Sequence, residues 1–141
     1  MRAQLPTLAI LAALSVGAPV PSVAHHTLFG IYERSQDTAM RGVVTEFNFV
    51  NPHPILVIAV QTGGGESESW QLEMDNRFEL SRIGITAETF LPGDQVFIKG
   101  SVGVVRARSF YLWRLDRPAD GFWYEQRGMT PHVGFQSQES D

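Results

Sequence analysis

Three strand patterns, one short helix pattern and two further strand patterns follow one another along the chain and predict an all-β fold with one short helix. This order of elements is typical of a small five-stranded OB-like barrel. The chain has 141 residues, of which 43% are hydrophobic and 18% charged, so its length and composition suit one globular domain. The sequence contains no cysteine, which excludes a disulfide framework, a thiolate metal site and a cysteine nucleophile.

The first 24 residues have the three parts of a secretory signal peptide. Arg2 is the only charged residue among them, and the apolar run 8–16 is too short to cross a bilayer as a helix. Small residues at Ser22 and Ala24 provide the cleavage signal. We therefore expect cleavage after Ala24 and a periplasmic or secreted bacterial protein without a membrane span. The shortened chain keeps 10 basic and 15 acidic residues, and this net charge of −5 argues against nucleic acid as a partner.

The expected organisation has four parts. They are the signal peptide (1–24), an N-terminal extension of the mature chain (25–39), the OB-like barrel (40–117) and a partly disordered C-terminal tail (118–141).

The first three strands are separated by a proline-rich interruption and a glycine-rich turn. From Met40 onwards the pattern is strand-like, with one face formed by Val43, Thr45, Phe47 and Phe49 and the other by Val44, Glu46 and Asn48. The segment 51–54, Asn-Pro-His-Pro, interrupts this strand because proline lacks a backbone donor and biases its predecessor to extended geometry. Residues 55–60 are apolar on both faces and predict a buried strand. The glycines at 63–65 predict a turn into a third strand at 70–74.

The only helix signal lies between the third and fourth strands. Asn76 is a preferred capping residue, and Glu79 three positions later completes the pattern of a capping box. Gly84 is suited to the left-handed conformation that ends a helix, so the sequence predicts a helix over 76–83.

Two strands are expected after the helix. A Leu-Pro-Gly-Asp turn at 91–94 precedes a fourth strand from 96 to 100, and a fifth strand is predicted from 104 to 115. Gly100 and Gly103 are positioned to allow the tight bend that a closing barrel needs.

Several of these segments together resemble a known family. They are His25-His26, Gly42-Val43-Val44, the stretch 49–53 that ends in Asn-Pro-His, Trp70-Gln71-Leu72-Glu73, the stretch 91–96 and Lys99-Gly100. They look like a family of small exported bacterial proteins of unknown function, with a mature His-His start and an Asn-Pro-His motif. More distantly, the layout is similar to exported bacterial OB-fold proteins linked with stress and ligand binding. The resemblance runs from about His25 to Leu115 and implies no catalytic residue, and Pro54 departs from the aromatic or aliphatic residue that the family has there.

The mature N-terminus is the main candidate for metal chemistry. If His25 is the first residue, its free amine (pKa about 7.7–8.0) and its imidazole (pKa about 6.5) can chelate one metal ion. Nitrogen ligands favour Cu(II), which leads the divalent affinity series. A further imidazole from His26 or His53 would complete the set, so the predicted metal site is His25, His26 and His53, with copper as the cofactor. Cleavage before Ala24 would instead place a histidine at the third position, which also suits Cu(II).

Simpler interpretations stand beside the metal site. The His-His pair can be a solvated chain start without further function, and the segment 51–54 can be turn chemistry alone. Arg106 and Arg108, assigned to one face of the fifth strand, are interpreted as a solvated basic face, and His132 as a solvated side chain.

Other functional classes remain as alternatives. One is an envelope module that binds a protein or a small ligand without metal, through a barrel face or the aromatic segment 122–124. Another is a copper oxidase or oxygenase that uses the same histidines. The sequence has no nucleophile elbow, paired-histidine helix, dinucleotide fingerprint or P-loop, so we assign no catalytic residue and favour a non-enzymatic protein.

Overall fold

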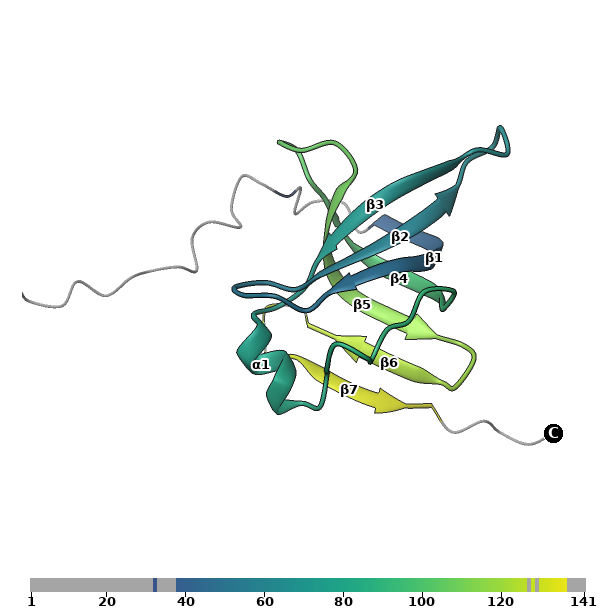
Figure 1. Ribbon diagram of the computed structural model, residues 1–141. Helices are drawn as coiled ribbons and strands as arrows, with labels where there is room; N and C mark the ends of the chain where they lie inside the picture. The colour runs from purple at the N-terminus through teal and green to yellow at the C-terminus, as the bar shows by residue number, and fades with distance from the viewer. Residues whose placement is uncertain (1–31, 33–37, 127, 129, 137–141) are drawn as a thin grey trace, which may run out of the picture.

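The computed structural model describes residues 32, 38–126, 128 and 130–136, which form seven strands and one short helix (Figure 1). The strands are β1 (Thr38–Asn48), β2 (Ile55–Gln61), β3 (Ser67–Glu73), β4 (Gln95–Val102), β5 (Ser109–Arg117), β6 (Phe122–Glu125) and β7 (His132–Phe135), and the helix is α1 (Arg77–Arg82). No helix within these residues is long and apolar enough to cross a membrane.

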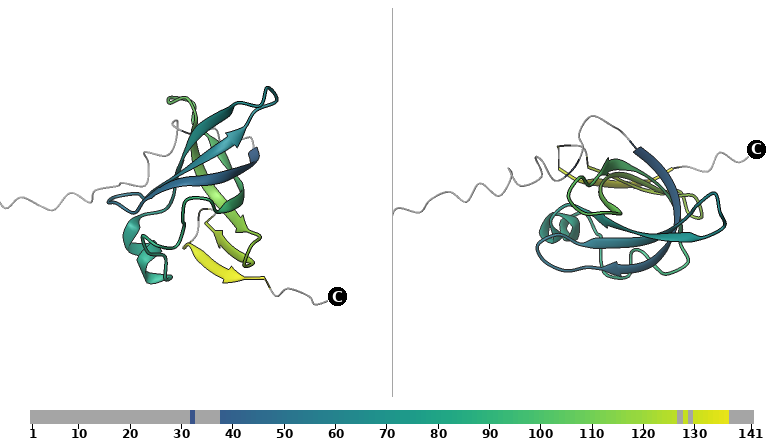
Figure 2. Two further views of the ribbon diagram at one scale, coloured as in Figure 1. Left: turned by 45° about the vertical axis from the view of Figure 1, so that its right-hand side comes forward. Right: turned by 90° about the horizontal axis from the view of Figure 1, so that it is seen from above.

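Strands β1 to β5 close into a barrel. β1 pairs antiparallel with both β2 and β4, β2 pairs with β3, and β4 pairs with β5. A parallel pairing between β3 and β5 closes the ring, which is seen from above in Figure 2. The order β1-β2-β3-β5-β4, with α1 between β3 and β4, is that of an OB fold. The predicted fold class, a five-stranded OB-like barrel with one short helix, is confirmed.

Strand β5 shares one of its edges between two partners. Its beginning, Ser109–Tyr111, pairs with β3, and its end, Arg114–Arg117, pairs with β6. β6 then pairs with β7, so a hairpin continues the sheet beyond the barrel (Figure 1). These two strands lie in the segment 118–141, which the sequence analysis treated as a tail, because each has only four residues.

A close approach of β4 and β5 explains the glycine at the predicted bend. The register between these strands shifts between Lys99 and Gly100. A Cβ atom at Gly100 would overlap the Tyr111 carbonyl oxygen and the Phe110 ring, so only glycine fits there without displacement of the neighbours. A Cβ at Gly103 would similarly overlap the Ser109 hydroxyl.

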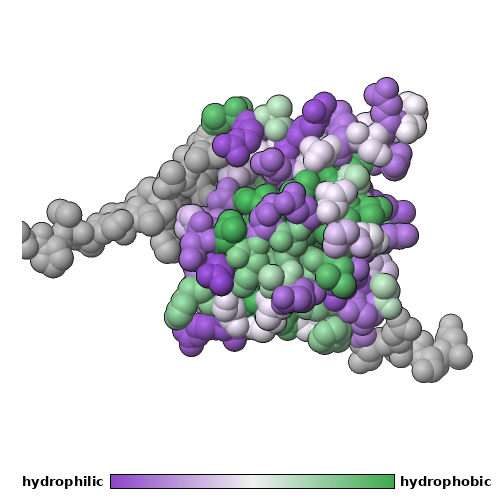
Figure 3. Space-filling view, viewed as in Figure 1, coloured by the Kyte–Doolittle hydropathy of each residue, from purple (hydrophilic) through white to green (hydrophobic). Residues whose placement is uncertain are grey.

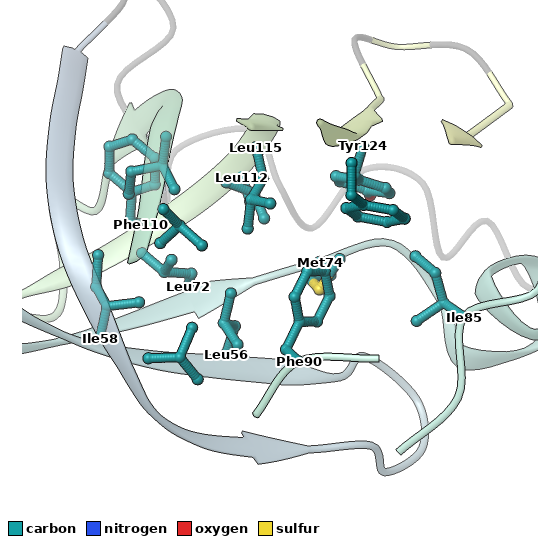
Figure 4. Packing of buried hydrophobic residues seen from close by; sticks show 14 of the residues in the cluster. Leu56, Ile58, Leu72, Met74, Ile85, Phe90, Phe110, Leu112, Leu115 and Tyr124 are labelled. Atoms are coloured by element: carbon teal, nitrogen blue, oxygen red, sulfur yellow. The ribbon is translucent and has the colours of Figure 1, made fainter. Parts of the chain in front are cut away.

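The barrel interior is filled by alternate side chains of the strands. Leu56 and Ile58 of β2 meet Leu72 of β3 and Leu112 of β5 in the core (Figure 4). Beyond them, Phe90 lies near Met74 and Tyr124 at the end of the barrel beside α1 (Figure 4). In β2 and β3 the fully buried residues Leu56, Ile58 and Leu72 alternate with partly exposed ones, as expected for strands that turn one face toward the core.

Phenylalanine rings packed edge-to-face attach the β6–β7 hairpin to the barrel. The ring centroids of Phe47 and Phe90 are 5.0 Å apart and edge-to-face, and those of Phe90 and Phe122 are 5.7 Å apart. Phe122 in turn packs at 5.6 Å against Phe135 of β7. Such aromatic pairs stabilise beyond their buried area, so the hairpin is part of the folded domain.

The helix has the ends that the sequence predicts, with one difference. Asn76 Oδ1 accepts a hydrogen bond from the Glu79 amide at 2.9 Å. At the other end Gly84 has φ +90°, and the amides of Gly84 and Ile85 donate back into the last turn. The reciprocal half of the capping box is absent, because the Asn76 amide donates to Asp75 Oδ1 at 2.6 Å instead of to Glu79.

The predicted start of the fifth strand is wrong. Residues 104–108 form the loop between β4 and β5, and β5 begins at Ser109. Val105 is 76% exposed, and Arg108 has a positive φ of 54°. Arg106 and Arg108 therefore do not share a strand face, and Arg108 forms an ion pair with Glu68 at 3.3 Å. The sequence of residues 104–108 resembles a strand pattern, but these residues take part in no strand pairing.

Candidate functional site

His53 lies in the loop that joins β1 and β2. Backbone hydrogen bonds attach this loop to the segment between β3 and α1. The carbonyl oxygen of Pro52 accepts from the Arg77 amide at 3.0 Å, and that of Pro54 accepts from the Met74 amide at 3.0 Å. The Asn-Pro-His-Pro segment at 51–54 therefore connects the end of β1 to the junction of β3 with α1.

The His53 ring is oriented by a backbone carbonyl. His53 Nδ1 lies 3.1 Å from the Met74 carbonyl oxygen. Because a carbonyl only accepts, Nδ1 carries the proton in this contact, and Nε2 of the neutral ring keeps its lone pair. Among the described residues Nε2 has no hydrogen-bond partner, and 35% of the side chain is exposed. Histidines that bind metals are usually held in this way through the other ring nitrogen.

A carboxylate links His53 to the N-terminal part of the chain. Glu73 Oε1 lies 3.8 Å from His53 Nδ1, and Glu73 Oε2 accepts a hydrogen bond from the Tyr32 hydroxyl at 2.5 Å. Tyr32 is buried, and its ring centroid lies 5.5 Å from that of Tyr111. Burial, and then the contact with Glu73, raise the pKa of Tyr32 far above its usual range, so the hydroxyl remains a donor.

Further titratable groups surround this end of the barrel. Burial raises the pKa of Asp75, and the neighbouring Glu79 carboxyl raises it further. Burial also raises the pKa of Tyr111 to about 12, and its hydroxyl donates to Gln126 Oε1 at 2.8 Å. The Tyr124 hydroxyl is buried and has no hydrogen-bond partner among the described residues. Several titratable side chains with raised pKa values therefore lie at the end of the barrel beside α1.

The described residues do not by themselves form the predicted metal site. No group of three or more His, Asp or Glu side chains within them is arranged to hold a metal ion. His25 and His26 lie outside the described residues. His132, at the start of β7, is exposed, as its interpretation as a solvated side chain requires.

One docking surface considered from the sequence is wrong. Phe122 is 6% exposed and Tyr124 is fully buried, so the segment 122–124 packs inside the fold and does not present three aromatic side chains to a partner. Trp123 is half-buried beneath the Arg114 guanidinium, 4.7 Å from its ring. Hydrophobic residues do gather in the middle of the face shown in Figure 3, with hydrophilic residues around them.

Sequence reasoning missed the contacts made by Glu73 and Asp75. Glu73 contacts both Tyr32 and His53, and Asp75 is half-buried. Their positions next to buried Leu72 and Met74 are visible in the sequence, but Tyr32 and His53, which contact Glu73, lie 41 and 20 positions away in the chain.

The amino-acid sequence matches the model of a known protein family. Residues 12–106 match a family of unknown function, DUF6152. The chain belongs to this family. The matched residues include His25, His26 and His53, and the family description assigns no activity to them.

Other comparisons add little. No curated protein matches the chain. Among solved structures, it is similar to a chain in the crystal structure of a complex of TiaS with an isoleucine tRNA, AMPCPP and agmatine, with 17% sequence identity and a TM-score of 0.41. The similarity covers 76% of this chain but only 28% of the length of that one.

Proposed function

We propose that this protein is an exported, non-enzymatic module that binds Cu(II) through His25, His26 and His53. The orientation of His53 is the observation that carries the proposal. Its Nδ1 is held by the Met74 carbonyl, so Nε2 is left to bind a ligand and little rotational freedom remains to be lost.

The attachment of Tyr32 supports a role for the N-terminal histidines. Tyr32 follows His26 by six residues, and a chain of that length spans at most about 20 Å. Tyr32 is joined to His53 through Glu73, with one contact of 2.5 Å and one of 3.8 Å. A chain held at Tyr32 therefore keeps His25 and His26 within reach of His53 at a high effective concentration.

The ligand chemistry favours copper among common divalent ions. Cleavage after Ala24 would create an amine next to the His25 imidazole, and both lose their protons at little cost near neutral pH. With His53 the set would contain only nitrogen donors, which suit Cu(II). Glu73 lies 3.8 Å from Nδ1 of His53, on the side of the ring away from the proposed ligand position at Nε2.

The test is a copper titration of the exported protein. Mass spectrometry first establishes its N-terminal residue, and Cu(II) binding is then followed by calorimetry and electron paramagnetic resonance. We expect one tight site with nitrogen hyperfine structure, and an affinity lower by about tenfold or more for His53→Ala, since one ligand is lost. His132→Ala, which changes an exposed histidine of β7, is the matched control and should bind like the wild type.

A second arm tests the free amine. A form with one additional alanine before the mature start displaces the amine from its histidine and should change both the affinity and the spectrum. The proposal fails if the mature chain starts at neither Ala24 nor His25, or if the extension and His53→Ala both leave the copper titration unchanged.

A further inference from the structure

A groove on the outside of the sheet lies apart from His53 and its neighbours. It has a volume of about 570 Å³ and is formed by β4, β5 and β6, with Gln136 following β7. Its lining combines two aromatic rings, Phe97 and Trp113, with charged and amide side chains. Grooves of this size accommodate small ligands. It exists because the β6–β7 hairpin extends the sheet past the barrel, so the five-strand pattern did not predict it.

The charged side chains of the groove hold one another in place. The Arg114 guanidinium donates through Nε to Asp116 Oδ1 at 3.0 Å and through Nη1 to Glu125 Oε2 at 2.9 Å. Gln136 Nε2 donates to Asp116 Oδ1 at 3.5 Å. Planar groups fixed in this way present their remaining hydrogen-bonding positions to a ligand without a further loss of side-chain entropy.

The aromatic side chains of the groove come from β4 and β5. Phe97 points outward from β4 and is 38% exposed, and the Arg41 guanidinium lies 4.6 Å from its ring centroid. Trp113 lines the groove from β5. The groove thus places two aromatic side chains beside a row of fixed polar groups.

We propose that this groove binds a neutral oligosaccharide. Within the lining, Lys99 and Arg114 balance Asp116 and Glu125, and Arg41 beside Phe97 adds one positive charge, so the groove is close to neutral and does not strongly favour an anionic polymer or a cation. A wholly apolar ligand would cover ion-paired groups without replacing their contacts with water. A sugar ring meets both requirements, since its C–H faces pack on aromatic rings while its hydroxyl edges exchange hydrogen bonds with carboxylates, amides and guanidinium groups.

This surface differs from the one through which OB folds commonly bind oligosaccharides and oligonucleotides. The usual surface is centred on the second and third strands, whereas the groove lies on β4, β5 and β6. The proposal does not depend on copper binding, because none of the proposed metal ligands lines the groove.

The test uses three defined neutral probes: cellohexaose, maltohexaose and chitohexaose. Each is titrated into the ¹⁵N-labelled protein, with amide chemical shifts as the readout. We expect at least one probe to bind and to shift amides of β4, β5 and β6, with an affinity that does not change between low and high salt because no charge is neutralised.

Two variants distinguish the groove from the rest of the surface. Phe97→Ala should weaken binding about tenfold, because it removes an aromatic contact. Phe78→Ala is the matched control, since it removes an exposed phenylalanine that also lies near an arginine, but on α1. Circular dichroism verifies that both variants are folded. The proposal is overturned if none of the probes binds, if the shifts map outside β4–β6, if high salt abolishes binding, or if Phe97→Ala and Phe78→Ala bind equally well.

Discussion

The Tyr32 hydroxyl donates a hydrogen bond to Glu73 Oε2 at 2.5 Å, across 41 positions of the chain. The same carboxylate lies 3.8 Å from His53 Nδ1 on its other oxygen. Glu73 therefore joins the N-terminal segment to the loop between β1 and β2. Both connections occur at the end of β3, next to the point where β3 and β5 close the barrel.

Loss of the Tyr32 hydroxyl should affect both stability and copper binding. Tyr32→Phe keeps the ring beside Tyr111 but removes the donor to Glu73, and we expect a loss of about 1 kcal/mol in the free energy of unfolding. With a looser anchor, the copper affinity should fall several-fold. Urea denaturation and copper titration measure the two effects.

Tyr111→Phe is the control for this variant. It also removes one phenolic hydrogen bond, to Gln126, but leaves the Tyr32–Glu73 contact intact. Equal copper affinities of the two variants would show that the Tyr32 anchor does not position the N-terminal histidines.

The close contact of β4 and β5 should make Gly100 intolerant of a side chain. Gly100→Ala places a methyl group against the Tyr111 carbonyl and the Phe110 ring, so we expect a destabilisation of about 1–3 kcal/mol. Gly64→Ala in the β2–β3 turn meets nothing within 4 Å and should change stability by less than about 0.5 kcal/mol. Thermal unfolding compares the two; similar melting temperatures would mean that the strands separate easily at this position.

Arg117, at the end of β5, joins the loop before β4 to the turn between β5 and β6. Its side chain is only 15% exposed, donates to the Thr89 carbonyl at 2.6 Å and pairs with Asp94 and Asp120 at 2.9 Å. Arg117→Ala removes the donor to the Thr89 carbonyl and the cation that pairs with Asp94 and Asp120, and we expect a loss of about 2 kcal/mol.

The exposed Arg82 provides the comparison. Its guanidinium lies 5.8 Å from the Phe78 ring on the helix surface, and Arg82→Ala should cost less than about 0.5 kcal/mol. Denaturant unfolding of both variants tests the difference. Comparable losses would contradict the role of Arg117 in joining the two segments.

Asp75 should make the stability depend on pH in a defined direction. Burial and the nearby Glu79 raise its pKa above the ordinary 3.8, so the folded state holds the proton more tightly than the unfolded state. Stability from this group is therefore greatest below pH 3.8 and declines as the pH rises through the raised pKa.

Asp75→Asn removes this titration while keeping an acceptor for the Asn76 amide. The free energy of unfolding of the variant, relative to the wild type, should increase as the pH rises from about 4 and then become constant. Urea denaturation at a series of pH values measures this difference. A difference that does not change with pH would refute the assignment.

Much of the barrel is predictable from local patterns. The presence of β2 and the ends of α1 follow from a short apolar run and from Asn76 and Gly84, since these signals act between residues close in the chain. The same reasoning failed at residues 104–108, where alternation occurs without a strand to pair with. It also overlooked β6 and β7, because strands of four residues give too little pattern to recognise.

The sequence by itself determined the order of the barrel elements, the helix caps and the histidines worth testing. Only the tertiary structure decided that Nδ1 of His53 faces Met74, that Tyr32 reaches Glu73, and that Arg114 and Phe97 line one groove. The reason is physical. Local elements depend on neighbours within a few residues, whereas these contacts depend on how β3 meets β5 and how the hairpin extends the closed sheet.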